Sequence, residues 1–223
     1  MAADNQSNII VPTLGEGIYL ISDASKILRL PIAKLRHWLI EFWDGRFASD
    51  YTYSFGSKGY RAINFYTLLE FYIFYQLRLK GLSAQKIQKF HLKISKDLNT
   101  LYPFARNIQT DGRNVWYEEL DALIKADQKK QLDIKSILEP FLQKIEFGTN
   151  NLAEKYYPLE KSKNIVVDPQ HQFGQPTISN TNIKTQTIFT LHKGGETNKV
   201  ISNLYNISMK KVQDAISFHK NVA

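Results

Sequence analysis

One segment, 65–79, constrains the fold more than any other, because it has the length of a helix and almost no polar face. Its apolar residues are Phe65, Tyr66, Leu68, Leu69, Phe71, Tyr72, Ile73, Phe74, Tyr75 and Leu77. Asn64 is suited to cap such a helix and Gly81 to end it. A helix that is apolar on all sides must be buried on all sides. We therefore expect a homodimer with this helix in or beside the interface; the alternative is a central core helix within one protomer.

The same segment is too short to cross a bilayer, which takes about 20 apolar residues. The N-terminus has no basic region ahead of an apolar run, so no signal peptide is predicted. The chain has no cysteine, which excludes disulfides, thiol catalysis and thiolate metal sites and fits a reducing compartment. We expect a cytoplasmic protein with no membrane partner.

The formal charge of +8 is concentrated in the N-terminal half of the chain. Residues 1–110 carry 14 Lys and Arg against 8 Asp and Glu, whereas residues 111–223 carry 15 against 13. Arg forms bidentate contacts with phosphate and guanine, so the first half suits a nucleic-acid face. A solvated basic surface fits the charge equally well.

Two short helices are predicted around a break at Leu30-Pro31. Ser22 is suited to cap the first, 23–28. In the second, apolar side chains recur at spacings of three and four: Ile32, Leu35, Trp38, Leu39 and Phe42. The other face of this helix carries Ala33, Lys34 and His37, with Arg36 at its margin. A tight turn between two helices, the second with a basic start, predicts a helix-turn-helix.

A hairpin is predicted directly after these helices. Aromatic and β-branched residues at 51–55 and 60–63 flank a turn bounded by Gly56 and Gly59. This is the place of the wing in a winged domain, where Lys58 and Arg61 would contact phosphate. A further helix is predicted from Ser83, with Ile87, Phe90, Ile94 and Leu98 on one face.

The N-terminal pattern resembles the winged helix-turn-helix of MerR-like regulators. The matching residues are Tyr19-Leu20-Ile21, Ala24, Leu35-Arg36-His37-Trp38, Leu79-Lys80-Gly81-Leu82-Ser83 and Ile87. No long heptad helix follows, and no cysteine is available as an effector site, so ligand-driven activation is not expected. The resemblance implies a DNA-binding domain over residues 1–105.

Residues 106–160 are predicted to form a helical connector. Helices are expected over 117–124 and 133–145, the second interrupted by Pro140. Clustered carboxylates at Glu118, Glu119 and Asp121 do not share one helical face, which favours a solvated surface over an acid–base pair.

The C-terminal segment, 161–223, is predicted to be a small domain of a second helix-turn-helix shape. Ile165-Val166-Val167 should form a strand that ends at Asp168-Pro169, and 185–191 could be helix or strand. A helix over 197–205 should present Val200, Ile201 and Leu204, and Ser208 should cap a final helix. The expected fold class is thus mainly α with a small β-hairpin wing.

This segment resembles the domain-of-unknown-function family numbered four hundred and thirty-three, known for VapB-type antitoxins. The matches are Asp168-Pro169, Gly174-Gln175-Pro176-Thr177-Ile178, Gly195, Val200, Tyr205, Ser208, Val212 and Ala215. The family's Gly-Thr-Arg-Ile-Pro-Val block is degraded here to Asn180-Thr181-Asn182-Ile183-Lys184-Thr185. Together with the N-terminal pattern, the resemblance implies an antitoxin of a type II toxin–antitoxin system.

The implied partners are double-stranded operator DNA, a PIN-like ribonuclease toxin and a second copy of the chain. The DNA-binding candidates are Ala33, Lys34, Arg36, His37, Lys58 and Arg61. The toxin-binding candidates are Lys193, Lys199, Lys210 and Lys211. The five histidines lack ligand spacing and no nucleophile motif is present, so no catalytic residue, metal or cofactor is predicted. The alternatives are a stand-alone transcriptional regulator and a protein–protein adaptor.

Overall fold

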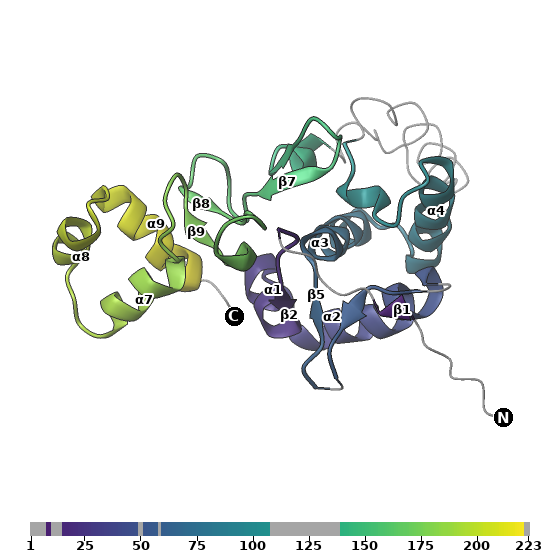
Figure 1. Ribbon diagram of the computed structural model, residues 1–223, viewed down its shortest axis with the longest axis horizontal. Coiled ribbons are helices and arrows are strands. Elements are labelled where there is room, and N and C mark those ends of the chain that lie inside the picture. Colours follow the sequence, from purple (N-terminus) through teal and green to yellow (C-terminus); the bar gives the residue numbers. More distant parts are fainter. Residues whose placement is uncertain (1–7, 10–14, 49–50, 58, 108–138, 221–223) are drawn as a thin grey trace.

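A computed structural model describes residues 8–9, 15–48, 51–57, 59–107 and 139–220. The chain is mainly α, as the sequence predicts, and its small sheets are antiparallel except for one parallel pair. Most of the buried side chains between Tyr19 and Tyr156 form one large core, and a smaller core lies between Ile165 and Phe218. The smaller core projects to one side of the larger one (Figure 1). Within these ranges, no helix combines the length and apolarity that crossing a bilayer requires.

Two helices begin the large core, α1 (Ile21–Leu28) and α2 (Ile32–Trp38). Arg29 connects them in the left-handed conformation, with φ of 56°. The predicted Ser22 cap is wrong: α1 begins at Ile21, and Leu20 occupies the N-cap without a side-chain hydrogen bond. The second helix does not continue as an α-helix to Phe42, because a π-helical segment, η1 (Leu39–Phe47), follows α2 directly.

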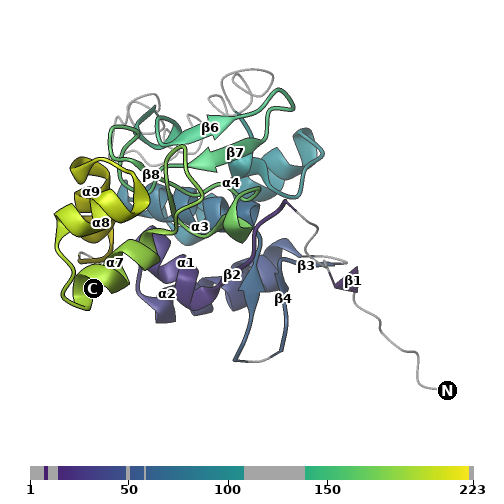
Figure 2. The ribbon, with the colours of Figure 1, turned by 60° about the vertical axis from the view of Figure 1, so that its left-hand side comes forward.

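A three-stranded antiparallel sheet lies against these helices, in the order β2 (Tyr19–Leu20), β5 (Ala62–Ile63) and β4 (Ser54–Phe55). Phe55 pairs with Ala62, so the predicted hairpin is confirmed. Its loop projects from the molecule beside α2 (Figures 1 and 2). A separate pair joins β1 (Asn8–Ile9) to β3 (Tyr51–Thr52) in parallel.

The apolar helix α3 (Phe65–Leu79) is the centre of the large core. Asn64 caps it as predicted, because its Oδ1 accepts from the Thr67 backbone N–H at 2.9 Å. The chain's own residues bury nearly all its sides, with Phe65, Phe71 and Phe74 at 0% exposure. The central-core alternative is therefore the one observed, and α3 gives no argument for a dimer.

Helix α4 (Ala84–Asp97) packs on α3 across a buried hydrogen bond. Ser83 caps α4 as predicted, accepting from the Lys86 N–H at 3.2 Å. His91 Nε2 lies 2.7 Å from Glu70 Oε2, and the two side chains are 1% and 0% exposed. Glu70 Oε1 accepts from the Phe104 N–H at 2.7 Å, which fixes the short 3-10 turn η2 (Pro103–Ala105) against both helices.

The expected helical connector is partly a β-hairpin. The helix predicted to reach Ile145 ends earlier, and β6 (Ile145–Phe147) pairs antiparallel with β7 (Ala153–Tyr156). Ile145 and Tyr156 then pack into the large core. The helical periodicity over 133–145 did not predict the turn that precedes β6 at Ile145. The predicted helix 117–124 and the acidic cluster lie outside the described residues.

The small core combines one hairpin and three helices. Strand β8 (Ile165–Val166) pairs with β9 (Thr177–Ile178), and the chain continues through α7 (Thr185–Lys193), α8 (Asn198–Tyr205) and α9 (Met209–Lys220). The ambiguous segment at 185–191 is thus helical. Of the three apolar residues that this helix was predicted to present, Ile201 is buried, whereas Val200 and Leu204 are exposed.

A buried tyrosine joins the two cores. Ile18 donates its backbone N–H to the Phe173 carbonyl at 3.1 Å. The adjacent Tyr19 is fully buried, and a Cβ added to Gly174 would lie 2.0 Å from its hydroxyl oxygen. Burial, together with the nearby Asp168 carboxylate, raises the pKa of Tyr19 well above its usual value. Only glycine therefore fits at 174, where φ is +82°.

Candidate nucleic-acid interface and candidate partner surface

The outer face of α2 gathers the four helical DNA-binding candidates. Leu35 and Trp38 are buried, which turns Ala33, Lys34, Arg36 and His37 toward solvent; all four are exposed. Lys34 Nζ lies 5.4 Å from the centre of the Tyr75 ring and 5.8 Å from that of Trp38. Such cation–π contacts orient the ammonium group without neutralising it.

An acidic side chain lies at the end of this face. His37 Nε2 is 2.7 Å from Glu41 Oε2, and the His37 side chain is 67% exposed. Glu41 also pairs with Arg46 through contacts of 2.8 Å. The carboxylate holds His37 in place and reduces the local positive potential. The spacing of four residues between His37 and Glu41 is the signal in the sequence that could have predicted this contact.

Asp44 organises the base of the β4–β5 hairpin. Its Oδ1 accepts from the Tyr53 and Ser54 backbone N–H groups at 2.8 and 3.0 Å. Its Oδ2 accepts from the Ser54 hydroxyl and from Arg61 Nη1, the latter at 3.0 Å. The Arg61 side chain is 40% exposed, so it reaches solvent while one face is held by Asp44. Lys58 lies outside the described residues.

A groove of about 740 Å³ separates α2 from the hairpin loop. Arg36 and Arg61, which are distant in sequence, both line it. Its other lining residues are Leu20, Ile21, Ser22, Leu39, Ile40, Gly59 and Tyr60. Ile40 and Tyr60 are 62% and 74% exposed, so the groove has cationic groups beside apolar surface. This arrangement can bind an anionic backbone while apolar side chains contact sugar or base.

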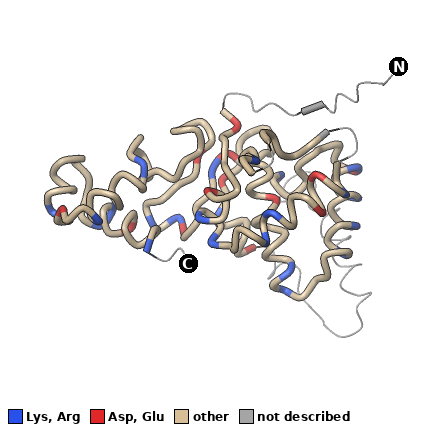
Figure 3. Tube along the Cα trace, turned by 90° about the horizontal axis from the view of Figure 1, so that it is seen from below, with Lys and Arg blue, Asp and Glu red and all other residues tan. Residues whose placement is uncertain are grey.

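The four toxin-binding candidates fall into two pairs. Lys210 lies 3.2 Å from Asp214 Oδ2 and donates to the Ser162 carbonyl at 3.3 Å. Lys211 donates to the Ser179 carbonyl at 3.1 Å. Lys193 and Lys199 are exposed and form no ion pair with a described residue. Figure 3 shows that Lys and Arg predominate over Asp and Glu at this end of the molecule.

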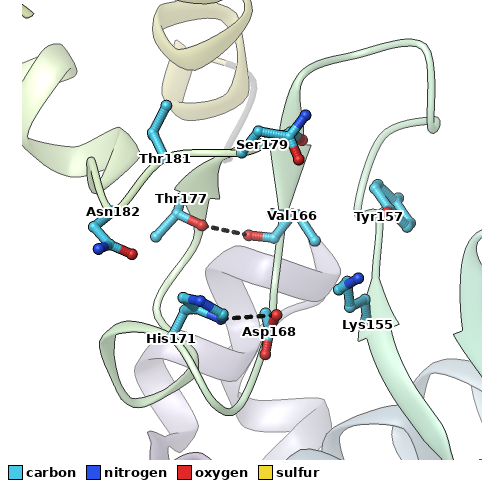
Figure 4. A pocket seen from close by; sticks show the side chains of 10 residues that line it. Lys155, Tyr157, Val166, Asp168, His171, Thr177, Ser179, Thr181 and Asn182 are labelled. Atoms are coloured by element: carbon cyan, nitrogen blue, oxygen red, sulfur yellow. Dashed lines mark hydrogen bonds and ion pairs between the residues drawn. The ribbon is translucent and has the colours of Figure 1, made fainter. Parts of the chain in front are cut away.

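A polar pocket of about 390 Å³ opens between β7 and the β8–β9 hairpin (Figure 4). Asp168 Oδ2 lies 2.9 Å from His171 Nδ1, an arrangement that orients the imidazole. Thr177 donates its hydroxyl to the Val166 carbonyl at 3.5 Å. Ser179 lies at the opposite end of the pocket from His171, and its hydroxyl has no partner among the described residues. The pocket therefore lacks the hydroxyl–imidazole hydrogen bond that activates a serine nucleophile.

Comparison with known proteins identifies the C-terminal segment. Residues 165–219 match the family described as a protein of unknown function, DUF433, which confirms the resemblance of that segment. The chain is also 22% identical over 221 residues to "Putative antitoxin VapB45" of Mycobacterium tuberculosis, covering 89% of this chain and 92% of that protein. It is 34% identical over 136 residues to "Uncharacterized protein Rv2308" of the same organism, covering 55% of this chain and 56% of that protein.

A solved structure shares the fold. The crystal structure of Rv2018 from Mycobacterium tuberculosis superposes with a TM-score of 0.70 at 22% identity, over 89% of this chain and 96% of that chain. The likeness therefore extends from the large core to the small one. The likeness of the N-terminal helices to MerR-like regulators stays a prediction.

Proposed function

We propose that this protein is an antitoxin that binds operator DNA through α2 and the β4–β5 hairpin and binds its toxin through the C-terminal segment. The observation that carries the DNA-binding proposal is the position of Arg36 and Arg61 on one groove, beside the exposed face of α2. The similarity to a protein named as an antitoxin supports the toxin-binding proposal. The toxin would be a PIN-like ribonuclease, as the resemblance implies.

In this proposal the start of α2 enters the major groove of the DNA. Ala33, Lys34 and His37 would approach base edges, and Arg61 with Lys58 would contact the phosphates. A recognition helix flanked by a phosphate-binding hairpin reads sequence with one element and fixes register with the other. Two copies on a palindrome would place half-sites about one helical turn apart. Light scattering of the free chain and of its DNA complex would give the copy number.

The test is the binding of labelled DNA from the protein's own promoter region, measured by fluorescence anisotropy at several salt concentrations. Arg36→Ala should weaken binding by about 1–3 kcal/mol if Arg36 reads a base. Arg61→Ala should reduce the slope of log K against log salt by about one unit. Lys89→Ala is the matched control, because Lys89 is exposed on α4, away from the groove. Unchanged affinity and slope in both arginine variants would refute the assignment of this groove.

A further inference from the structure

An exposed apolar strip runs along α8 and into the start of α9. We call it the α8 strip, and it consists of Val200, Leu204 and Met209, which are 48%, 66% and 43% exposed. Val200 and Leu204 are four residues apart, so they lie on one side of the helix. Ile201 is buried in the small core, and half-buried Tyr205 packs against that core from the end of α8. Because Leu204 is 66% exposed, most of its apolar surface contributes no burial free energy to the fold of this chain.

The surroundings of the strip are basic. Lys199 is the neighbour of Val200, and Lys193 ends the preceding helix; both are exposed. Glu196 is the only acidic residue between Pro169 and Gln213. Residues 161–223 carry 8 Lys against 3 Asp and Glu, a net charge of +5. Helix α8 lies at the end of the molecule farthest from α4 (Figure 1).

Charge argues against a second copy of this chain on the α8 strip. A two-fold contact places the same patch of both copies face to face. Lys199 of each copy would then lie near Lys199 of the other, with only Glu196 available to compensate. Like charges opposed across an interface disfavour the association.

DNA is also a poor occupant. In a helix-turn-helix the second helix, here α9, enters the major groove. One flank of α9 is already covered, because Asp214 Oδ2 accepts from the Asn164 side chain at 2.8 Å and Lys210 reaches the Ser162 carbonyl. The uncovered surface is α8, whose exposed leucine and valine match no group on a phosphate backbone.

We propose that the α8 strip is the docking surface for the partner protein, and that it fits an apolar patch bordered by Asp and Glu side chains. Leu204 would be the central anchor, and Lys193 and Lys199 would pair with the acidic border. This inference rests on the proposed antitoxin function and names the surface that performs it. Lys210 and Lys211 are not part of the proposed docking surface, because their ammonium groups already bind Asp214 and the Ser179 carbonyl within the chain.

The test takes the product of any ribonuclease-like gene adjacent to the gene of this chain and measures its binding to the full-length chain by calorimetry; the absence of such a gene would count against the proposed function. Leu204→Glu should weaken binding by at least about tenfold, because a buried anchor becomes a charge facing acidic residues. Lys199→Glu should weaken it by about fivefold or more and reduce its salt dependence. Leu79→Glu and Lys89→Glu are matched controls; Leu79 is 61% exposed at the end of α3. Both controls should bind within about twofold of the unaltered chain.

The outcomes separate the two proposals. If the unaltered chain does not bind the neighbouring gene product, the proposed function fails and this inference fails with it. If the unaltered chain binds and both α8 variants bind equally well, only the α8 strip is wrongly assigned. Operator binding by the same variants is the third measurement, and it should not change. A loss of DNA affinity in Leu204→Glu with intact protein binding would make α8 a DNA contact and overturn the inference.

Discussion

The buried contact between Glu70 and His91 should contribute several kcal/mol to the stability of the large core. Both carboxylate oxygens are used, one by His91 at 2.7 Å and the other by the Phe104 backbone N–H at 2.7 Å. Glu70→Ala removes the carboxylate that accepts from both of these buried groups. Removing one partner of a buried pair costs about 3–5 kcal/mol. For a chain of this size that corresponds to a fall in Tm of roughly 6–20 °C.

The assay is urea unfolding followed by tryptophan fluorescence. All three tryptophans lie before residue 117, so fluorescence reports on the N-terminal part of the chain and not on the small core. Lys155→Ala is the control, because Lys155 pairs with Glu146 at the same 2.7 Å but is 35% exposed. Breaking that pair should cost about 1 kcal/mol or less. Equal losses in Glu70→Ala and Lys155→Ala would refute the argument that burial decides the value of the pair.

Three further predictions concern single side chains. Burial lowers the pKa of His219 from 6.5 to about 4. Between these pH values the unfolded chain binds more protons than the folded chain, so stability should fall as the pH drops from 6.5 to 4. His219→Gln should flatten this decline, measured as the midpoint of thermal unfolding at each pH. Gly174→Ala should be less stable than Gly195→Ala by about 1–3 kcal/mol in urea unfolding followed by far-UV circular dichroism, which reports on both cores, since both glycines have positive φ but only Gly174 abuts Tyr19; equal losses would contradict the steric argument. Asn64→Ala should cost about 1 kcal/mol by the same assay, and a neutral result would show that the cap contributes nothing.

Sequence reasoning succeeded where a local signal determines structure. The Asn64 and Ser83 caps, the Gly-bounded hairpin and the strand before Asp168 all follow from residues within a few positions of each other. It located the exposed face of α2 for the same reason, because a helical period assigns Leu35 and Trp38 to one side. These elements place the candidate DNA-binding side chains.

Features set by tertiary packing could not be predicted from periodicity. The spacing of Val200 and Leu204 shows that they share a side of α8, but apolarity alone does not say whether the chain covers that side. Glu70 is an acidic residue within an apolar helix, which signals a buried partner, yet nothing in the sequence points to His91, 21 positions away. Likewise, nothing in the sequence indicates that Arg61 pairs with Asp44, 17 positions away.

These pairings change what the formal charge predicts about DNA binding. Residues 1–110 carry a net charge of +6, and six unpaired cations on DNA would give a salt slope of about −5 per protomer. Among the described candidates, however, His37 and Arg61 have acidic partners, and only Lys34 and Arg36 have none. Arg61 still reaches solvent beside Asp44, so Lys34, Arg36 and Arg61, or four cations with Lys58, give a slope of about −3 to −4 per protomer. A measured slope of about −5 or steeper would mean that further cations reach phosphate when DNA binds, such as Arg46, which Glu41 now holds.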